Sequence, residues 1–552
     1  MRKWFSIFLL ATLLRLSAMA QIPLTLQIGA TNGMVTVSSS TNPADGYFFG
    51  ELETTTNLSQ PIVWNETVAP YTVTSVASNY PAANFQEFFR FVQHYPVFEF
   101  AIFYNLNMEF VSASSMTVTG PVFCNQSIWE GSSTLIFAST VDAVGTNDTT
   151  ATDPFANDYT ASGNPAFSLA GQPVSGAGAL NLSIGTNAEA ILDLPPLAYA
   201  MGTVAAYSNT GQVYLANAAD LYITNSARGT NFGALTSTGT NTFIYYQDSL
   251  NAQSLTPISP DYYSLKTGGS TNFVSISPTA GLDCVTNVRF ASYSFITNVL
   301  FYDWREGWNG GSGINGKGKV VQAIQIDIST FNKWLTNTAS NGGSYYSLLN
   351  VEDKGHPINS VYVYNAVPLT GTTLPAVRVV HGQQLPSDYG FTIATPQPLY
   401  ILGNYNVQTP AGSSSGQNNT VYTYPAALMA DAITILSSNW NDTVTSKDPS
   451  VSPSTTTINA ACLEGIVQSN PDISGNYSGG VENFLRFLEA WGTLYFNGSI
   501  VVMFPSQYAT NSWQQTGNYY TFPRRNWAFD TNFTQVSKLP PLTPQVVNFV
   551  TP

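Results

Sequence analysis

Residues 116–122 (MTVTGPV) and 134–137 (TLIF) belong to a series of short apolar runs that decides the fold of this chain. The series continues at 180–184 (LNLSI), 213–215 (VYL), 220–223 (DLYI) and 242–246 (TFIYY), with Gly, Asn and Ser between the runs. Runs of this length between turn residues predict strands. Such strands fit a parallel β-solenoid, in which each strand stacks on the next turn of the chain. A β-sandwich with long loops is the alternative.

The second half of the chain predicts more strands and a few peripheral helices. The strand runs are 361–364, 376–380, 391–393 and 399–402. We expect a short helix at 329–338. Helical spacing of apolar residues predicts a helix at 425–439, from Leu428, Met429, Ala432, Ile433 and Leu436, and another at 481–491, from Val481, Phe484, Leu485, Leu488 and Trp491. Asp431 and Glu482 are expected at the surface of these helices or at their caps.

The N-terminal part predicts a signal peptide and a small β-module. Residues 1–20 combine Arg2 and Lys3 with an apolar run and an Ala-Met-Ala cleavage site before Gln21. Cleavage is favoured over a membrane anchor, because Arg15 interrupts the apolar run. Alternating runs in 21–95 indicate a β-sandwich-like module, and its "FFR" ending resembles small modules of secreted bacterial proteins. The predicted organisation is therefore 1–20 signal peptide, 21–95 module, and 96–552 solenoid-like body with C-terminal helices.

The composition excludes a nucleic-acid-binding protein. Charged residues make up 9% of the chain and the net charge is −14, with only 18 Lys and Arg. Neither a basic footprint for a nucleic acid nor a polybasic segment for an anionic membrane is present in the sequence. Asn, Ser, Thr and Gln keep the chain soluble, and 13% aromatic residues supply material for a core. This composition is typical of secreted β-proteins.

Cysteines and histidines predict no metal or cofactor site. Cys124, Cys284 and Cys462 lie far apart and lack the CxxC spacing of a metal site, so we interpret them as buried residues, with at most one bonded pair. The three histidines, His94, His356 and His381, are expected in strands or at the surface. The sequence predicts no catalytic, cofactor-binding or metal-binding residue.

Residues 301–308 (FYDWREGW) form the densest cluster of acidic and aromatic side chains. Asp303 and Glu306 have the residue types of an acid/base pair beside a stacking Trp, as in carbohydrate-cleaving enzymes. The alternative is a structural turn in which Arg305 pairs with one of the two acids. We favour this alternative, because neighbouring residues on a strand point to opposite faces. Two further stretches, the Gly-rich 309–319 and the charged 352–356, are expected to be loops.

An ordered set of motifs between residues 96 and 546 resembles a group of uncharacterised bacterial envelope proteins. The motifs are 301–303 (FYD), 305–307 (REG), 399–406 (LYILGNYN), 477–489 (YSGGVENFLRFLE), 497–501 (NGSIV), 524–530 (RRNWAFD) and 539–544 (LPPLTP). Some members of this group are associated with type IV pilus or pseudopilus assembly. The resemblance implies a place in the cell envelope and supplies no catalytic residues. The chain differs from pilus subunits in having a cleavable-type signal instead of a prepilin leader.

The sequence therefore predicts a secreted structural or adhesive cell-envelope protein without catalysis. Its expected location is extracellular, on the cell surface or in the periplasm. Its expected partners are envelope or pilus components or surface glycans, with no nucleic acid and no membrane span after signal cleavage. The alternative is a carbohydrate-binding protein, or a lyase or hydrolase, built on a β-helix.

Overall fold

The structure, a computed structural model, describes most of the chain from residue 88 onward and the strands before it. The described residues are 25–31, 34–40, 49–55, 65–72, 75–81, 88–111, 116–131, 134–148, 165–182, 188–200, 203–225, 241–246, 261–266, 273–274, 295–307, 318–336, 356–386, 389–408, 419–444, 452–470, 477–490, 492–513 and 520–550. The predicted signal peptide, Cys284, Glu352 to Lys354 and most of the Gly-rich stretch lie outside these residues.

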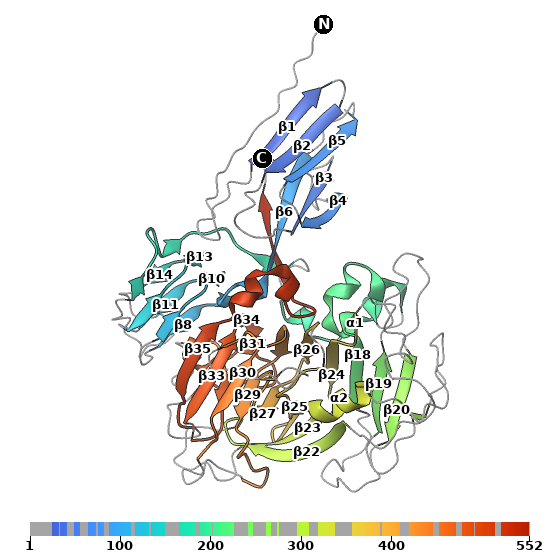
Figure 1. Ribbon diagram of the computed structural model, residues 1–552, viewed down its shortest axis with the longest axis vertical. Coiled ribbons are helices and arrows are strands. Elements are labelled where there is room, and N and C mark those ends of the chain that lie inside the picture. The colour runs from blue at the N-terminus through green and yellow to red at the C-terminus, as the bar shows by residue number, and fades with distance from the viewer. Residues whose placement is uncertain are drawn as a thin grey trace.

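The N-terminal module contains two antiparallel sheets (Figure 1). The first sheet consists of β1 (Thr25–Thr31), β2 (Met34–Ser40) and β5 (Ser75–Pro81). The second has the order β17-β36-β6-β3-β4, with β3 (Phe49–Thr55), β4 (Asn65–Thr72), β6 (Phe88–Pro96), β17 (Asn181–Leu182) and β36 (Gln545–Val550). The last strand of the chain thus completes a sheet that begins at its N-terminal end.

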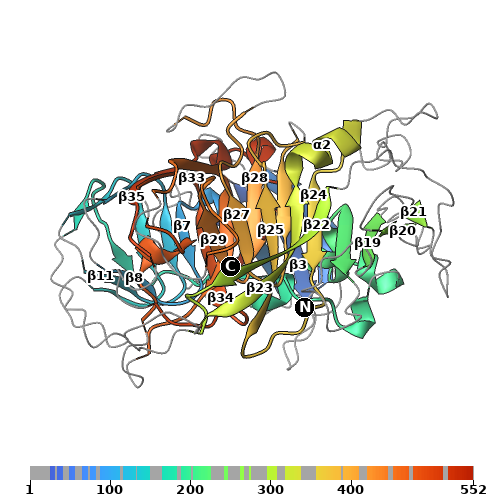
Figure 2. The ribbon, with the colours of Figure 1, turned by 90° about the horizontal axis from the view of Figure 1, so that it is seen from below.

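The body is organised by one large sheet of 13 strands, ten of which run parallel to their neighbours. The parallel strands, in spatial order, are β16 (Val174–Ser175), β13 (Val141–Ala143), β10 (Val122–Cys124), β7 (Ile102–Tyr104), β34 (Ile500–Pro505), β31 (Ala461–Ile466), β28 (Ala426–Ala430), β26 (Phe391–Ala394), β24 (Ser360–Tyr364) and β18 (Leu221–Asn225). Antiparallel strands β19 (Asn241–Tyr246), β20 (Asp261–Lys266) and β21 (Phe273–Val274) follow β18. Figure 2 shows the strands side by side along the body, from β8 and β11 at one end to β19, β20 and β21 at the other.

Smaller sheets form the other walls of the body. At one end they are β8-β11-β14, with β8 (Met108–Phe110), β11 (Ile128–Glu130) and β14 (Asn147–Asp148), and β9-β12-β15, with β9 (Met116–Val118), β12 (Leu135–Phe137) and β15 (Ala166–Phe167). In the C-terminal half they are β22 (Ile296–Asp303), β23 (Lys319–Asp327), β25 (Thr373–Val380), β27 (Leu399–Leu402), β29 (Ile433–Leu436) and β32 (Arg486–Phe487), and then β30 (Thr456–Asn459), β33 (Thr493–Gly498) and β35 (Arg524–Phe529).

The chain visits the walls in a repeating order, and side chains of the same kind stack between the walls. It runs from β7 to β8 to β9, and then from β10 to β11 to β12. Ile102, Val122 and Val141 stand in register on neighbouring strands, and all three are buried. Three-residue strands bury enough apolar surface in this way because each strand contributes one layer to a shared core. The predicted mainly β class is therefore confirmed.

One of the three predicted helices is confirmed and two are wrong. Helix α2 (Ile328–Thr336) matches the expected 329–338. Residues 425–439 instead form β28 and β29 around a turn, and 481–490 form a 3-10 turn, η8 (Val481–Asn483), followed by β32, while Trp491 lies outside the described residues. The apolar spacing in 425–439 gave a wrong prediction of a helix. Residues 426–437 are all buried, so the apolar positions did not mark one buried face of a helix. No helix in the described part is long and apolar enough to cross a membrane.

Candidate functional site

Asp303 lies at the end of β22 and is almost fully buried. Its Oδ1 accepts hydrogen bonds from the backbone N–H of Arg305 at 2.8 Å and of Glu306 at 3.3 Å. Its Oδ2 accepts a hydrogen bond of 2.6 Å from the hydroxyl of Tyr400 on β27. The carboxylate thus caps the turn that follows β22 and ties it to a neighbouring wall.

Glu306 belongs to the same turn but has a different set of partners. Its Oε1 lies 2.8 Å from Nη2 of Arg486 on β32, and both side chains are buried. Its Oε2 accepts a hydrogen bond of 3.2 Å from the backbone N–H of Asn511. Asn511 also donates from Nδ2 to the carbonyl of Arg305 at 2.6 Å and accepts from Arg486 at 3.2 Å. The ion pair of Glu306 is thus formed by Arg486, which comes from a distant part of the chain.

Aromatic rings enclose this charged turn. The ring of Tyr400 meets that of Phe301 edge to face at 4.9 Å, and Trp304 stacks on Trp440 at 5.5 Å. Such pairs contribute about 0.5–1.5 kcal/mol beyond their buried area. Trp304 is 1% exposed, so it presents no open face on which a sugar could stack, and Trp308 lies outside the described residues.

A small pocket adjoins the cluster on the side of β31 and β32. Arg305, Arg486 and Glu464 line it together with Ser478 and Trp513. Its free volume of about 20 Å³ has room for one or two water molecules. Neither Asp303 nor Glu306 lines it, so the structure does not bring the two acids together at a cavity.

Burial dominates the ionisation of the acids in this region. It raises the pKa of Glu306, an effect that the neighbouring Arg486 opposes. Burial also raises the pKa of Glu464 well above its usual value, although Arg486 and the backbone N–H of Ile433 favour its charged form. The hydroxyl of Tyr400 has a raised pKa because it is buried and faces Asp303. Burial is therefore the largest influence on the pKa of each of these groups.

Glu464 and Arg486 were not singled out from the sequence, although a signal was present. Each is a lone charged residue in an apolar run, ACLEGI on β31 and FLRFL around β32. A charge in such a run is buried once both faces of the strand are covered, and buried charges require partners.

Asp431 and Glu482 were expected at the surface of helices or at their caps. This expectation is wrong, because both residues are buried. Asp431 sits in the turn between β28 and β29 and accepts hydrogen bonds from the backbone N–H groups of Gln507, Tyr508 and Ala509. It fixes the loop that follows β34.

Glu482 takes part in a joint between the segment at residues 109–111 and the segment at residues 469–482. It accepts hydrogen bonds from the backbone N–H of Val111 at 3.1 and 3.2 Å. From the other side of this joint, Glu109 accepts hydrogen bonds from the hydroxyls of Ser469 at 2.8 Å and Ser478 at 2.5 Å. The parallel pairing of β34 with β7 continues the large sheet across this joint.

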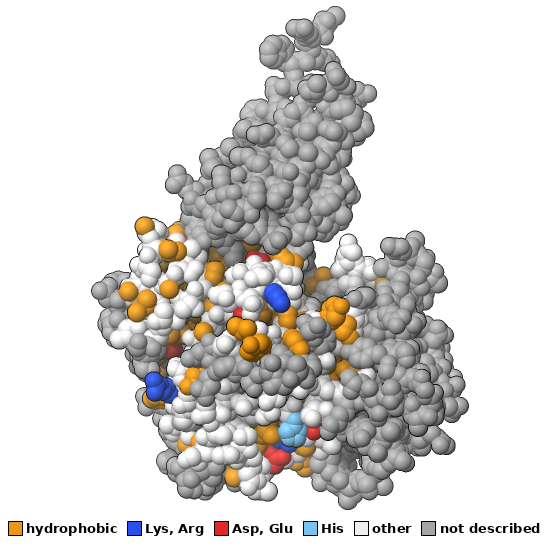
Figure 3. Space-filling view, in the orientation of Figure 1, with side chains coloured by type: hydrophobic (Ala, Val, Ile, Leu, Met, Phe, Trp, Pro, Cys, Tyr) orange, Lys and Arg blue, Asp and Glu red, His pale blue; other side chains and the backbone are white. Residues whose placement is uncertain are grey.

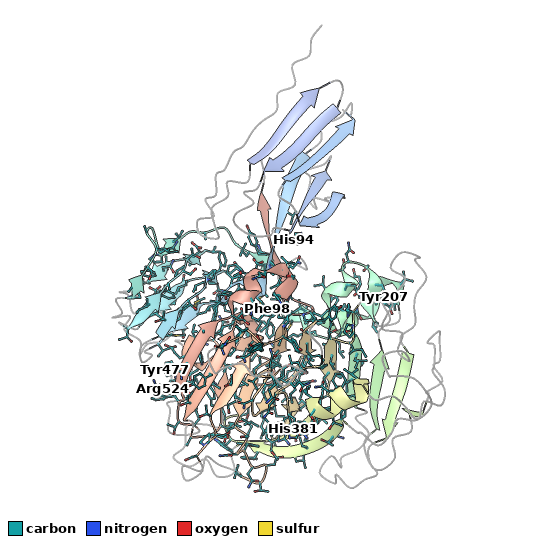
Figure 4. All side chains as sticks on the ribbon, viewed as in Figure 1. His94, Phe98, Tyr207, His381, Tyr477 and Arg524 are labelled. Atoms are coloured by element: carbon teal, nitrogen blue, oxygen red, sulfur yellow. The ribbon has the colours of Figure 1, made fainter. Side chains whose placement is uncertain are left out.

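The cysteines and histidines do not converge in the described residues. Cys124 and Cys462 are buried free thiols, so they do not form a bonded pair with each other. His381 pairs with Asp327 at 2.9 Å and is well exposed. Figure 4 places His94, on β6, at the end of the N-terminal module that adjoins the body, and His381 on the far side of the body. No group of three or more metal-ligating side chains gathers in the described part of the chain.

Comparison with known proteins yields no family, no curated relative and no similar solved structure for this chain.

Proposed function

We propose that the protein is a secreted structural or adhesive protein of the bacterial cell envelope and that its body is a parallel β-solenoid. The proposal that the protein is not catalytic rests on one observation. The two acids of the charged cluster are already occupied by partners within the protein. The oxygens of Asp303 and Glu306 are engaged by protein groups, and the adjoining pocket has room for only one or two water molecules. An acid or base that acts on a polymer requires a cleft in which the substrate reaches it.

Asparagine ladders support the solenoid. Asn497 donates to Asn459 Oδ1 at 2.6 Å, and Asn459 donates to the carbonyl of Asn406 at 2.9 Å, so three successive turns of the chain are linked at one corner. A second ladder links Asn125 to Asn105 at 2.9 Å at another corner. Stacked amides at matching positions are expected where successive turns repeat the same path.

The surface supports a structural or adhesive role. In the face shown in Figure 3, charged side chains are few and scattered among polar and apolar ones. The long stack of strands gives a rigid, extended scaffold, as is usual for repeat proteins. A weakly charged surface of this kind suits contact with neutral polymers or protein neighbours better than contact with nucleic acid.

Localisation and processing of the protein in its native host test this proposal. We expect the protein in the envelope or the medium, and we expect an intact mass that starts at Gln21. Full-length protein retained in the cytoplasm would contradict the proposal, and an uncleaved chain in the membrane would contradict its processing step.

A carbohydrate-binding role is the second candidate, and exposed aromatic side chains favour it. Tyr389, Tyr422 and Phe522 are 57%, 47% and 52% exposed. Phe391 pairs with Ala426 on neighbouring parallel strands, so Tyr389 and Tyr422 precede these strands at the same edge of the sheet. Aromatic faces exposed in this way are suited to stacking against sugar rings.

A glycan array with the mature protein separates the two candidates. Binding that is lost in Tyr389→Ala or Tyr422→Ala, and kept in the control Leu369→Ala, would favour the carbohydrate role. Leu369 is a suitable control because it is 41% exposed and aliphatic. Release of product from a bound glycan, abolished by Glu306→Gln in folded protein, would overturn the non-catalytic proposal.

A further inference from the structure

The last strand of the chain occupies a slot between two strands from the other end of the sequence. Strand β36 pairs with β6 over six residue pairs, from Gln545 with Pro96 to Val550 with Phe91. On its other side it pairs with β17 over two residue pairs. Figure 1 shows β36 leaving the body and rising into the N-terminal module. Without β36, this edge of β6 would expose a row of unpaired backbone groups, which sheets tend to cover with another strand.

The slot is specific for this strand. Val546 is fully buried and Val547 is 3% exposed, and Val546 packs in the same core cluster as Tyr95 of β6. The register places Val546 opposite Tyr95 and Val547 opposite His94. A strand of another sequence would have to supply small branched side chains at these positions.

The segment that leads to β36 has the properties of a hinge. Residues 539–544 (LPPLTP) contain three prolines, which donate no backbone hydrogen bond and favour an extended chain. Leu542 has a φ of 59°, a left-handed conformation that is strained in a residue other than glycine. Two backbone carbonyls tie the hinge to the rest of the protein, that of Pro541 to the hydroxyl of Thr392 at 2.6 Å and that of Pro544 to the N–H of Val97 at 3.0 Å. A straightened hinge would relieve the strain at Leu542.

We propose that β36 is an exchangeable arm that takes the same slot in a second copy of this chain. Two copies that exchange arms reciprocally keep every pairing of β36 with β6 and β17, so only the path of the hinge differs from that of the single chain. Reciprocal exchange leaves no slot empty and no arm unpaired, and it therefore yields a closed dimer. The partner is a second copy because the slot matches the register and the buried valines of this strand.

Paired cysteine variants of the mature chain test the exchange directly. One population carries His94→Cys and the other carries Val547→Cys, because these residues are partners in the register. Both populations carry Cys284→Ser, and Cys124 and Cys462 are buried free thiols. After incubation together at high concentration and mild oxidation, we expect a disulfide-linked dimer that contains one chain of each population. Residues opposite each other in a sheet lie close enough for a disulfide.

The matched control replaces Val547→Cys with Asn548→Cys. In the register, residue 548 is the partner of residue 93 and not of residue 94, so a thiol at residue 548 is not placed directly opposite the thiol at residue 94. We expect the mixture with Val547→Cys to give at least about tenfold more cross-linked dimer than this control, which corresponds to ~1.4 kcal/mol.

A single chain that carries both His94→Cys and Val547→Cys shows whether the arm occupies the slot within one molecule. If this chain closes on itself while the mixture gives no more dimer than the control, the arm is fixed and the proposal is wrong. If the double variant does not close and the mixture gives no dimer, the slot itself is not formed as described, which also overturns the proposal.

Discussion

At the scale of single residues, the protein places charges in its interior and matches several of them with a partner from a distant part of the sequence. Glu306 and Arg486 are the clearest pair, because both are buried and their charged atoms lie 2.8 Å apart. Breaking a buried pair leaves one charge without compensation, whereas removing both charges can be nearly neutral. The pair is therefore a test of whether the cluster is structural.

We expect Glu306→Gln to lower the free energy of unfolding by about 3–5 kcal/mol, because Arg486 stays buried without its counter-charge. The double variant Glu306→Leu, Arg486→Met should recover most of this loss. Denaturant titration of the three chains measures the effect. Equal losses in the single and double variants would show that the charge itself is required.

Asp303 and Tyr400 allow a second test at this scale. Asp303→Asn weakens an acceptor that serves the Tyr400 hydroxyl and two backbone N–H groups, so we expect a loss of about 1–3 kcal/mol. A double-mutant cycle with Tyr400→Phe should give a coupling energy above ~0.5 kcal/mol, since the two groups are in contact. Additive losses would mean that their hydrogen bond contributes nothing to stability.

At the scale of elements, stability comes from short strands that share one core. Phe484 and Leu488 flank β32 and are 1% and 0% exposed, so these predicted core residues are buried although they are not in a helix. Their burial depends on the neighbouring walls, because a two-residue strand cannot bury them by itself.

We expect Phe484→Ala to cost about 3–5 kcal/mol, as for other buried aromatic truncations. The matched control is Phe522→Ala, whose side chain is 52% exposed and whose removal should cost less than ~0.5 kcal/mol. Chemical denaturation followed by circular dichroism measures both variants. A loss below ~1 kcal/mol for Phe484→Ala would remove this residue from the core.

At the scale of the whole molecule, buried acids couple stability to pH. Burial raises the pKa of Glu99 and of Glu130 from the usual 4.5 to about 8, and Asp148 adds to the shift of Glu130. Burial also raises the pKa of Asp142 from 3.8 to about 7. Both oxygens of Glu130 are buried without a hydrogen-bond partner, which explains why its neutral form is favoured.

We expect the protein to become less stable as the pH rises from about 5 to 9. Between the unfolded and folded pKa values the folded chain binds more protons than the unfolded chain, so stability decreases with pH in this range. Glu130→Gln mimics the neutral acid and should raise the melting temperature at pH 8 more than at pH 5. Thermal unfolding across this pH range checks both statements, and a stability that rises steadily toward pH 8 would contradict them.

The sequence by itself determined the class of the protein and several of its core residues. Short apolar runs between Gly, Asn and Ser predicted strands, because the side-chain alternation and the turn residues are local properties of the chain. The helix at 329–338 and the burial of Phe484 and Leu488 followed from such local patterns.

Only the tertiary structure decided which distant residues meet. In 425–439 the same apolar spacing fitted a helix and two strands, and burial on both faces made the strands the outcome. The pairing of Glu306 with Arg486, of Glu482 with Val111 and of β36 with β6 joins segments far apart in the chain. Local propensity carries no information about such pairs, because their stability arises from burial and from the exclusion of water once the walls have come together.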